Sequence, residues 1–144
     1  MATNLTRAQS ITGSNTKKVE FFSDFLNSFA KTPYGNQLGR VTNEQSVNQS
    51  LKNLVMTNIG ERMFQPFVGC NVYDYLFEPN VQDYITSLES YIEDTIKISE
   101  PRVNAQEITV SQGYDEQTIQ IKIVYNLINN PAPITLDFLL KRVR

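Results

Sequence analysis

Apolar residues recur at the spacing of an amphipathic helix in two stretches of the chain. A repeat near 3.6 residues places such side chains on one face, which a helix buries against a core. The repeat predicts one helix over about residues 43–58 and a second over about 80–98. The stripes consist of Val47, Leu51, Leu54, Val55 and Ile59 in the first helix, and of Val81, Tyr84, Ile85, Leu88, Tyr91, Ile92, Thr95 and Ile96 in the second.

Short signals mark the ends of the first helix and the nature of the segment after it. Thr42 and Gln45 fit a capping box at its start, and Gly60 fits the position just after its end. Residues 60–79 hold two glycines and two prolines among aromatic side chains. This composition predicts a packed irregular connector with one short helical turn near residues 72–76.

The second helix has its own start and stop signals. Glu78 and Pro79 suit its start, because proline fits a first helical turn and acidic side chains favour the positive end of the helix dipole. Pro101 ends it, since proline lacks an N–H and pushes Glu100 out of the helical region. The chain must therefore leave this joint in an extended conformation.

Beyond Pro101 apolar and polar residues alternate, the pattern of strands with one buried face. A short run at Ile108 and Val110 is followed by turn-forming residues at 112–116. A longer run has its apolar positions at Ile119, Ile121, Ile123, Tyr125 and Leu127. Residues 129–133, with two prolines, are expected to interrupt the sheet. The last run, over about 134–140, predicts an edge strand that pairs within this chain or with a neighbouring one.

These elements predict an α+β fold, with two main helices packed on a small, mainly antiparallel sheet from the C-terminal half. We expect a single domain over residues 18–144. Residues 1–17 carry too little apolar area to offset their ordering entropy, so we expect a flexible N-terminal tail there. Between Phe21 and Phe29 the apolar residues are spaced like those of one short amphipathic helix.

Composition narrows the classes of function. The 13 basic and 15 acidic residues give a net charge of −2, so we expect protein partners, and neither nucleic acid nor a membrane. The chain has no apolar window of membrane-spanning length and no signal-peptide pattern at its start. Histidine is absent and Cys70 is the single cysteine, which excludes His-dependent catalysis and argues against a zinc site. We expect no catalytic residue, no cofactor and no metal.

Three charged motifs lie at the joints between these elements. Gly60-Glu61-Arg62 is followed by Gln65-Pro66-Phe67, then by Leu76-Phe77-Glu78-Pro79, and last by Glu100-Pro101-Arg102. In this order and spacing, the motifs resemble the small baseplate wedge subunit of contractile-tailed phages, a lysozyme-like baseplate family with relatives in type VI secretion systems. The resemblance covers roughly residues 19–130.

The resemblance implies a structural part of the tail baseplate of a virion, assembled in the host cytoplasm. Such a subunit binds other baseplate wedge proteins and helps the tail sheath to start, with the tail tube as a further candidate partner. In the family, the Glu-Pro-Arg motif is associated with holding the subunit onto the helical core of the wedge. We therefore expect the partner-binding residues to be Glu100, Pro101, Arg102, Glu61, Arg62 and Glu78. For residues 22–25 the resemblance implies an extended or turned lead-in, so this conformation and the short helix both stay open.

Simpler interpretations of the charged motifs stay open. Glu61 and Arg62 can be two solvated charges after a helix. Glu100 and Arg102 can be an exposed ion pair at a helix end, worth at most about 1 kcal/mol. An exposed or partly exposed pair predicts that Arg102→Ala leaves the isolated chain folded, whereas lysine at this position would restore only part of a bidentate contact.

A peptidoglycan hydrolase is the main functional alternative, because Glu61, Glu78 and Glu100 could supply the two carboxyl groups of a glycosidase. Each of them lies beside an arginine or at a helix start, where the charged form is favoured. Such surroundings lower a pKa, which is the wrong direction for a general acid. A carbohydrate-binding surface is a weaker alternative, because aromatic residues in such a connector more often fill the core. It would consist of Tyr73, Tyr75, Phe77 and Tyr84.

Overall fold

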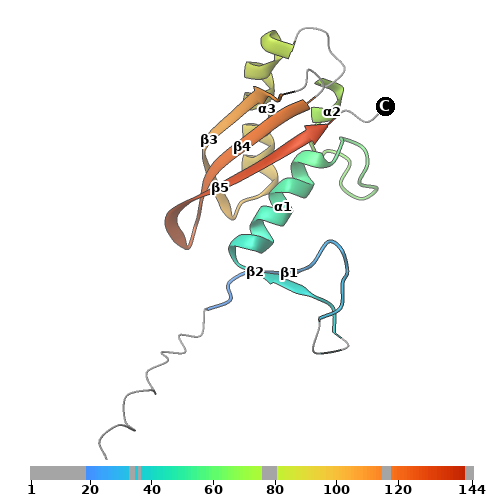
Figure 1. Cartoon of the computed structure of the whole chain (residues 1–144), viewed down its shortest axis with the longest axis vertical. Coiled ribbons are helices and arrows are strands. Elements are labelled where there is room, and N and C mark those ends of the chain that lie inside the picture. Colours follow the sequence, from blue (N-terminus) through green and yellow to red (C-terminus); the bar gives the residue numbers. More distant parts are fainter. Residues whose placement is uncertain (1–18, 33–34, 36, 76–80, 115–117, 142–144) are drawn as a thin grey trace, which may run out of the picture.

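A computed structural model describes residues 19–32, 35, 37–75, 81–114 and 118–141. Within them the chain forms helices and strands in the mixed order of an α+β fold, which confirms the predicted class (Figure 1). The elements are β1 (Ser23–Phe25), β2 (Arg40–Thr42), α1 (Glu44–Met56), α2 (Val72–Tyr75), α3 (Val81–Ser99), β3 (Val103–Gln112), β4 (Thr118–Leu127) and β5 (Asn130–Lys141).

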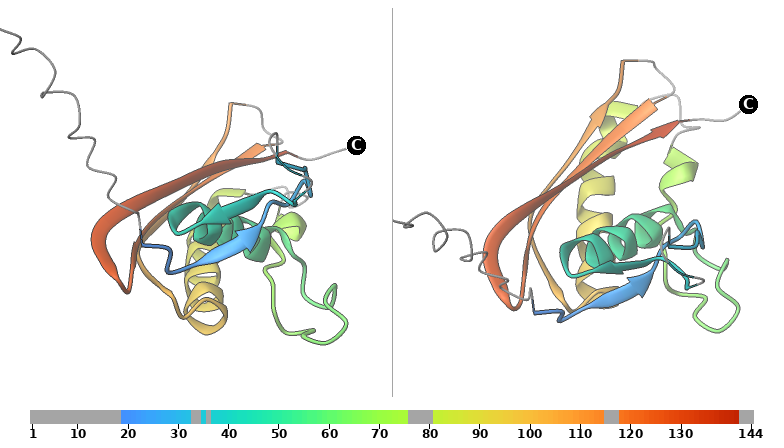
Figure 2. Two further views of the ribbon diagram at one scale, coloured as in Figure 1. Left: turned by 90° about the horizontal axis from the view of Figure 1, so that it is seen from below. Right: turned by 60° about the horizontal axis from the view of Figure 1, so that its bottom comes forward.

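The C-terminal half forms an antiparallel sheet of three strands, in the order β3-β4-β5 with β4 at the centre. The register pairs Val103 with Leu127 across β3 and β4, and Thr118 with Lys141 across β4 and β5. Helices α1 and α3 lie on the same side of this sheet, as Figure 2 shows. The predicted hairpin is confirmed, and both of its strands are longer than the alternation of apolar residues indicated.

One face of β4 is the centre of the core. Its alternate residues Ile119, Ile121, Ile123, Tyr125 and Leu127 are all buried, as the pattern predicted. They pack in one cluster with the buried stripes of α1 and α3. The hydroxyl of Tyr125 donates a hydrogen bond of 2.8 Å to the Asn48 side chain on α1, so its polar end is satisfied inside the core. Burial, with the nearby charges of Glu44 and Glu100, raises the pKa of Tyr125 to about 12.

The first helix forms where the repeat predicted it, but its ends differ. Its N-cap is Asn43, which has a positive φ of 51° and makes no side-chain capping bond. Thr42 belongs to β2, so the predicted capping box is wrong. At the other end the residue after Met56, Thr57, is already extended. Gly60 therefore lies inside the following loop rather than at the helix end.

Asn43 instead holds the N-terminal segment against the domain. Its side-chain oxygen accepts a hydrogen bond of 2.9 Å from the N–H of Phe21, and its amide donates one of 3.0 Å to the carbonyl of Val19. The segment continues into β1, which pairs antiparallel with β2. The extended lead-in is confirmed and the short helix over residues 21–29 is wrong, because hydrogen bonds to a distant segment of the same chain outweigh the local apolar spacing.

The last strand begins earlier than expected. Residues 129–133 were expected to interrupt the sheet, yet β5 starts at Asn130 and includes both prolines. A register shift between Asn126 and Leu127 accommodates them, and an edge strand tolerates proline because one side of it needs no N–H. β5 pairs with β4 of the same chain, so the pairing left open by the sequence is intramolecular.

The remaining elements agree with the sequence, and two predictions lie outside the described residues. α2 provides the short helical turn expected in the connector, and α3 matches the predicted second helix. The tail at residues 1–17 and the helix start at Glu78 and Pro79 fall outside the part of the chain that the structure describes.

Candidate partner-binding site

The Glu-Pro-Arg motif forms the turn between α3 and β3. The N–H of Glu100 donates the last helical bond of α3, 2.8 Å to the carbonyl of Ile96. The carbonyl of Glu100 then accepts a bond of 3.1 Å from Val103, the first residue of β3. Pro101 lies at the tip of this turn and is exposed. The motif therefore stops a helix and starts a strand within three residues, as its proline predicted.

The carboxylate of Glu100 is buried, with 5% of the residue exposed. It accepts two parallel hydrogen bonds from Arg102, of 2.5 Å from Nε and 2.7 Å from Nη2. A third bond of 2.7 Å comes from the hydroxyl of Ser50 on α1. The interpretation of Glu100 and Arg102 as an exposed ion pair is wrong, because the helices and the joint enclose the carboxylate.

Arg102 connects three parts of the molecule through this pair. Its guanidinium carbon lies 5.4 Å from the centre of the Phe22 ring, a cation–π contact with the segment before β1. Through Glu100 it also reaches Ser50 on α1 and the end of α3. The arrangement ties the two main helices and the N-terminal segment together at one joint. The direct contact of Arg102 with a neighbouring subunit stays a prediction.

The surroundings of Glu100 favour its charged form. Burial alone would raise its pKa, but the hydrogen bonds from Arg102 and Ser50 outweigh burial and hold the pKa below its usual range. The same hydrogen bond raises the pKa of Arg102. A carboxyl group that stays ionised and has its oxygens bonded cannot donate a proton as a general acid near neutral pH.

The Gly-Glu-Arg motif lies in the loop between α1 and α2 and uses its two charges differently. The carboxylate of Glu61 accepts 3.0 Å bonds from the backbone N–H and the side-chain amide of Asn58, so it stabilises its own loop. Arg62 is exposed, and no ion pair joins it to another described residue. It lines a cavity of about 250 Å³ together with Glu100, Gln65 and Ile98. The structure thus brings Arg62 and Glu100 to one place, while Glu78 lies outside the described residues.

Sequence reasoning missed the exposed apolar side chains of this loop. The connector was expected to be packed, and Val68, Tyr73 and Tyr75 do pack against the core. Met63, Phe64 and Phe67, however, point into solvent. Their spacing is that of one helical face, and the signal against it was Pro66, which breaks a helix between Phe64 and Phe67.

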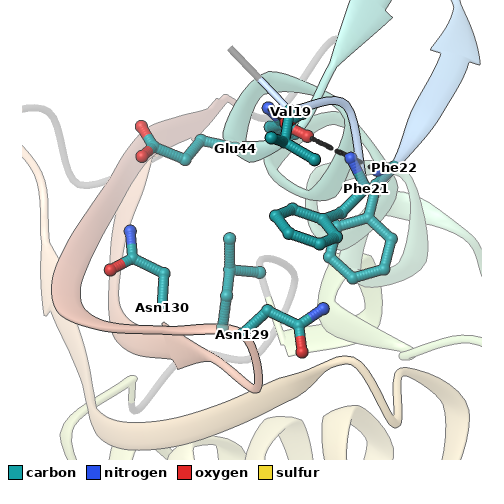
Figure 3. Close-up of a pocket in the computed structure, with 8 residues that line it drawn as sticks. Val19, Phe21, Phe22, Glu44, Asn129 and Asn130 are labelled. Atoms are coloured by element: carbon teal, nitrogen blue, oxygen red, sulfur yellow. Dashed lines mark hydrogen bonds between the residues drawn. The ribbon is translucent and has the colours of Figure 1, made fainter.

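A second cavity, of about 220 Å³, lies where the N-terminal segment crosses the turn between β4 and β5. Figure 3 shows the rings of Phe21 and Phe22 on one side of it and Asn129 and Asn130 on the other. Glu44 is the one ionisable side chain among the residues that line it. A lone carboxylate offers neither the acid–base pair of a hydrolase nor a metal site.

The tyrosines considered for carbohydrate binding are only partly available. Tyr73 packs on the core, whereas Tyr75 and Tyr84 form an edge-to-face pair with ring centres 6.0 Å apart and line a cavity of about 300 Å³. Phe77 lies outside the described residues. Within the described ranges no three Cys, Asp or Glu side chains gather as metal ligands. None of the described helices has the length and apolar content needed to cross a membrane.

Comparison with known proteins finds one matching family and a relative within it. Residues 41–132 match the family described as baseplate wedge protein gp25. The chain is 30% identical over 104 residues to baseplate wedge protein gp25 of Enterobacteria phage T4, which covers 72% of this chain and 79% of that protein.

Two solved structures share the fold. A proposed tail lysozyme from Geobacter sulfurreducens is 22% identical with a TM-score of 0.63, over 70% of this chain and 92% of the other. A chain of the anti-feeding prophage baseplate is 18% identical with a TM-score of 0.58, over 83% and 85% of the two chains. With the family match over residues 41–132 and the similarity to the phage T4 protein, the chain belongs to the gp25 family of baseplate wedge proteins.

Proposed function

We propose that this protein is a structural subunit of a contractile tail baseplate wedge, which binds neighbouring wedge proteins and helps the tail sheath to begin assembly. Membership of the gp25 family is the observation that carries the structural role in a tail baseplate. Assembly in the host cytoplasm, and contacts with the sheath and the tail tube, are further parts of the proposal. Of the six residues expected from the sequence to bind partners, Arg62 and Glu78 are proposed to contact them directly. Glu61 and the joint at Glu100, Pro101 and Arg102 are proposed to hold the contact surface in place.

The two edges of the sheet differ in how well they could accept an added strand from a sheath subunit. The edge at β3 is partly occupied, because the carboxylate of Glu89 on α3 accepts a 2.8 Å hydrogen bond from the backbone N–H of Val110. Unpaired N–H groups of an edge strand are what an incoming strand would use. A side chain of the same molecule has taken one of them on β3.

The edge at β5 is different. β5 spans Asn130–Lys141 and pairs with β4 on one side, and no described strand lies on its other side. Since the N–H of Val110 faces away from β4, the alternation of an antiparallel ladder places the N–H groups of Asp137 and Leu139 on the free edge of β5. We propose that this edge receives a strand of the first sheath subunits.

Two substitutions at one position test the sheath step. Leu139→Pro removes an outward N–H, whereas Leu139→Ala keeps it. Because Leu139 is exposed, neither substitution removes a buried side chain. We expect both variants to join wedge complexes, and only Leu139→Pro to slow sheath polymerisation on purified baseplates. Equal polymerisation rates for the two variants would remove β5 from the proposal.

The hydrolase alternative is not supported by the geometry, although one solved structure of the same fold is named as a tail lysozyme. Glu100 is held ionised by Arg102 and Ser50, and Glu61 is bonded to Asn58. We expect purified protein to leave peptidoglycan intact in a turbidity assay. Hydrolysis that disappears in Glu61→Gln or Glu100→Gln would establish the enzyme instead.

A further inference from the structure

Large apolar side chains gather on the outside of the loop between α1 and α2. Three of them are almost fully exposed, Met63 at 90%, Phe64 at 98% and Phe67 at 90%. Ile98, near the end of α3, is 82% exposed and lines the same cavity as Arg62 and Gln65 of the loop. The loop projects from the body of the molecule beside α1 in Figures 1 and 2. Four large apolar side chains exposed on one loop and on the helix end beside it indicate an interaction site.

The loop that carries these side chains is held in one conformation. Its ends meet through a 2.7 Å hydrogen bond from the N–H of Cys70 to the carbonyl of Thr57. A second bond of 2.8 Å, from Gly60 to Pro66, closes its tip. At Gly69 the backbone has a φ of 141°, and a Cβ there would lie 2.5 Å from the Thr57 oxygen. A surface ordered before binding loses little conformational freedom when a partner docks.

The backbone of the loop folds into tight turns. Within it, the N–H of Gln65 bonds to the carbonyl of Arg62 and the N–H of Val68 to that of Gln65, at 3.2 and 3.1 Å. The loop therefore offers no extended edge for a strand to pair with. A partner must be recognised through side chains, as a helix is when its apolar face is laid on a groove.

The positive charge of Arg62 favours an apolar partner that also carries a carboxylate. Glu61 is bonded to Asn58, and Glu100 is neutralised by Arg102, so Arg62 is the charge of this cavity that has no opposite partner among the described residues. A helix with a carboxylate beside its apolar stripe would complement this arginine. A second copy of this chain, docked by the same patch, would bring two Arg62 side chains together.

We propose that the loop over residues 57–70, with Ile98, is the docking surface for an amphipathic helix of another wedge protein. This proposal rests on the proposed function. The apolar side chains of the helix contact Met63, Phe64 and Phe67, and one enters the cavity beside Ile98. A carboxylate of the helix pairs with Arg62. Glu100, which lines the same cavity, and its partner Arg102 position this surface.

The experiment reconstitutes wedge complexes from this protein and the other wedge proteins of the same baseplate. The main variant is the double substitution Phe64→Ser and Phe67→Ser, and the matched control is Tyr114→Ser, which removes an equally exposed ring at the far end of β3. We expect the double variant to lose about 30-fold or more in affinity, the loss typical of removing interface anchors, and the control to bind like wild type. Urea unfolding of each variant should match wild type.

Two further measurements identify the occupant. A photo-crosslinking residue at Met63 should attach to one helical segment that contains an acidic residue. Arg62→Glu should weaken binding about tenfold, and reversing the charge of that acidic residue in the partner should restore it.

Three other outcomes of the binding experiment would contradict the docking surface, the proposed function or the occupant. If the wedge proteins bind wild type and the double variant equally, the docking surface is wrong while the proposed function stands. If they do not bind wild type at all, the proposed function fails and the docking surface with it. If wild type forms dimers that the double variant cannot form, the occupant is a second copy and the helix proposal is overturned.

Discussion

The joint between α3 and β3 and the loop between α1 and α2 each carry a glutamate and an arginine, yet they use them in opposite ways. At the joint, Glu100 and Arg102 bond to each other and to Ser50, and the carboxylate is buried. In the loop, Glu61 accepts hydrogen bonds from the backbone and side chain of Asn58, while Arg62 stays exposed beside apolar side chains. A charged motif can therefore brace the fold or face a partner, and burial with hydrogen bonding distinguishes the two roles.

The largest expected effect on stability is at the joint. Arg102→Ala leaves the buried carboxylate of Glu100 with only the Ser50 hydroxyl, so we expect a loss of about 3 kcal/mol in the free energy of unfolding. Arg102→Lys should lose less, because it keeps the charge without the fork. The control is Lys97→Ala, which breaks an exposed 2.7 Å pair with Glu93. That control should leave the urea midpoint close to that of the wild type. Equal urea midpoints for Arg102→Ala and Lys97→Ala would contradict the internal brace.

Two glycines of the loop provide the next comparison. Gly69→Ala forces a Cβ to within 2.5 Å of the Thr57 oxygen at a φ of 141°, whereas a Cβ on Gly60, at a φ of 90°, meets nothing within 4 Å. We expect Gly69→Ala to lower the unfolding free energy by about 2 kcal/mol and Gly60→Ala by about 1 kcal/mol. Thermal unfolding measures both. If Gly60→Ala proves the more damaging, the loop is not closed at Gly69 as the structure has it.

The pH dependence of stability is the smallest effect. The folded pKa of Glu100 lies below its unfolded value near 4.3, so this group stabilises the fold above that pH and loses its contribution as pH falls through the folded pKa. The stability difference between wild type and Glu100→Gln should be constant from about pH 5 to 7 and shrink below about pH 4. Urea titrations across this range measure it. A difference that grew on acidification would mean that Glu100 is protonated in the folded protein.

The sequence predicted those elements whose apolar residues repeat with a clear period. The buried face of β4, from Ile119 to Leu127, and the stripe of α3 could be read in this way, because each repeat has a single face that must leave water. It failed where distant contacts decide the local structure. The capping box at Thr42 did not form because Thr42 pairs with β1, and β5 accepts two prolines because it lies at an edge.

The candidate site could be predicted only in part. The position of Glu100, Pro101 and Arg102 at a fixed corner followed from proline chemistry. The enclosure of Glu100 did not, because Ser50 approaches it from a helix 50 residues away in sequence. Likewise, the outward direction of Phe64 and Phe67 depends on how Cys70 closes the loop onto Thr57, which no local pattern encodes.

On this proposal Arg102 stabilises the fold and Phe64 contacts the partner, and one pair of assays on two variants tests both roles. Arg102→Ala and Phe64→Ser are each measured by urea unfolding of the isolated chain and by incorporation into wedge complexes at a temperature where both are folded. The account predicts that Arg102→Ala is destabilised but still incorporates, whereas Phe64→Ser unfolds like wild type and incorporates poorly. The opposite pattern, a stable Arg102→Ala that fails to incorporate beside a Phe64→Ser that incorporates normally, would place the partner at the Glu-Pro-Arg motif and contradict the account.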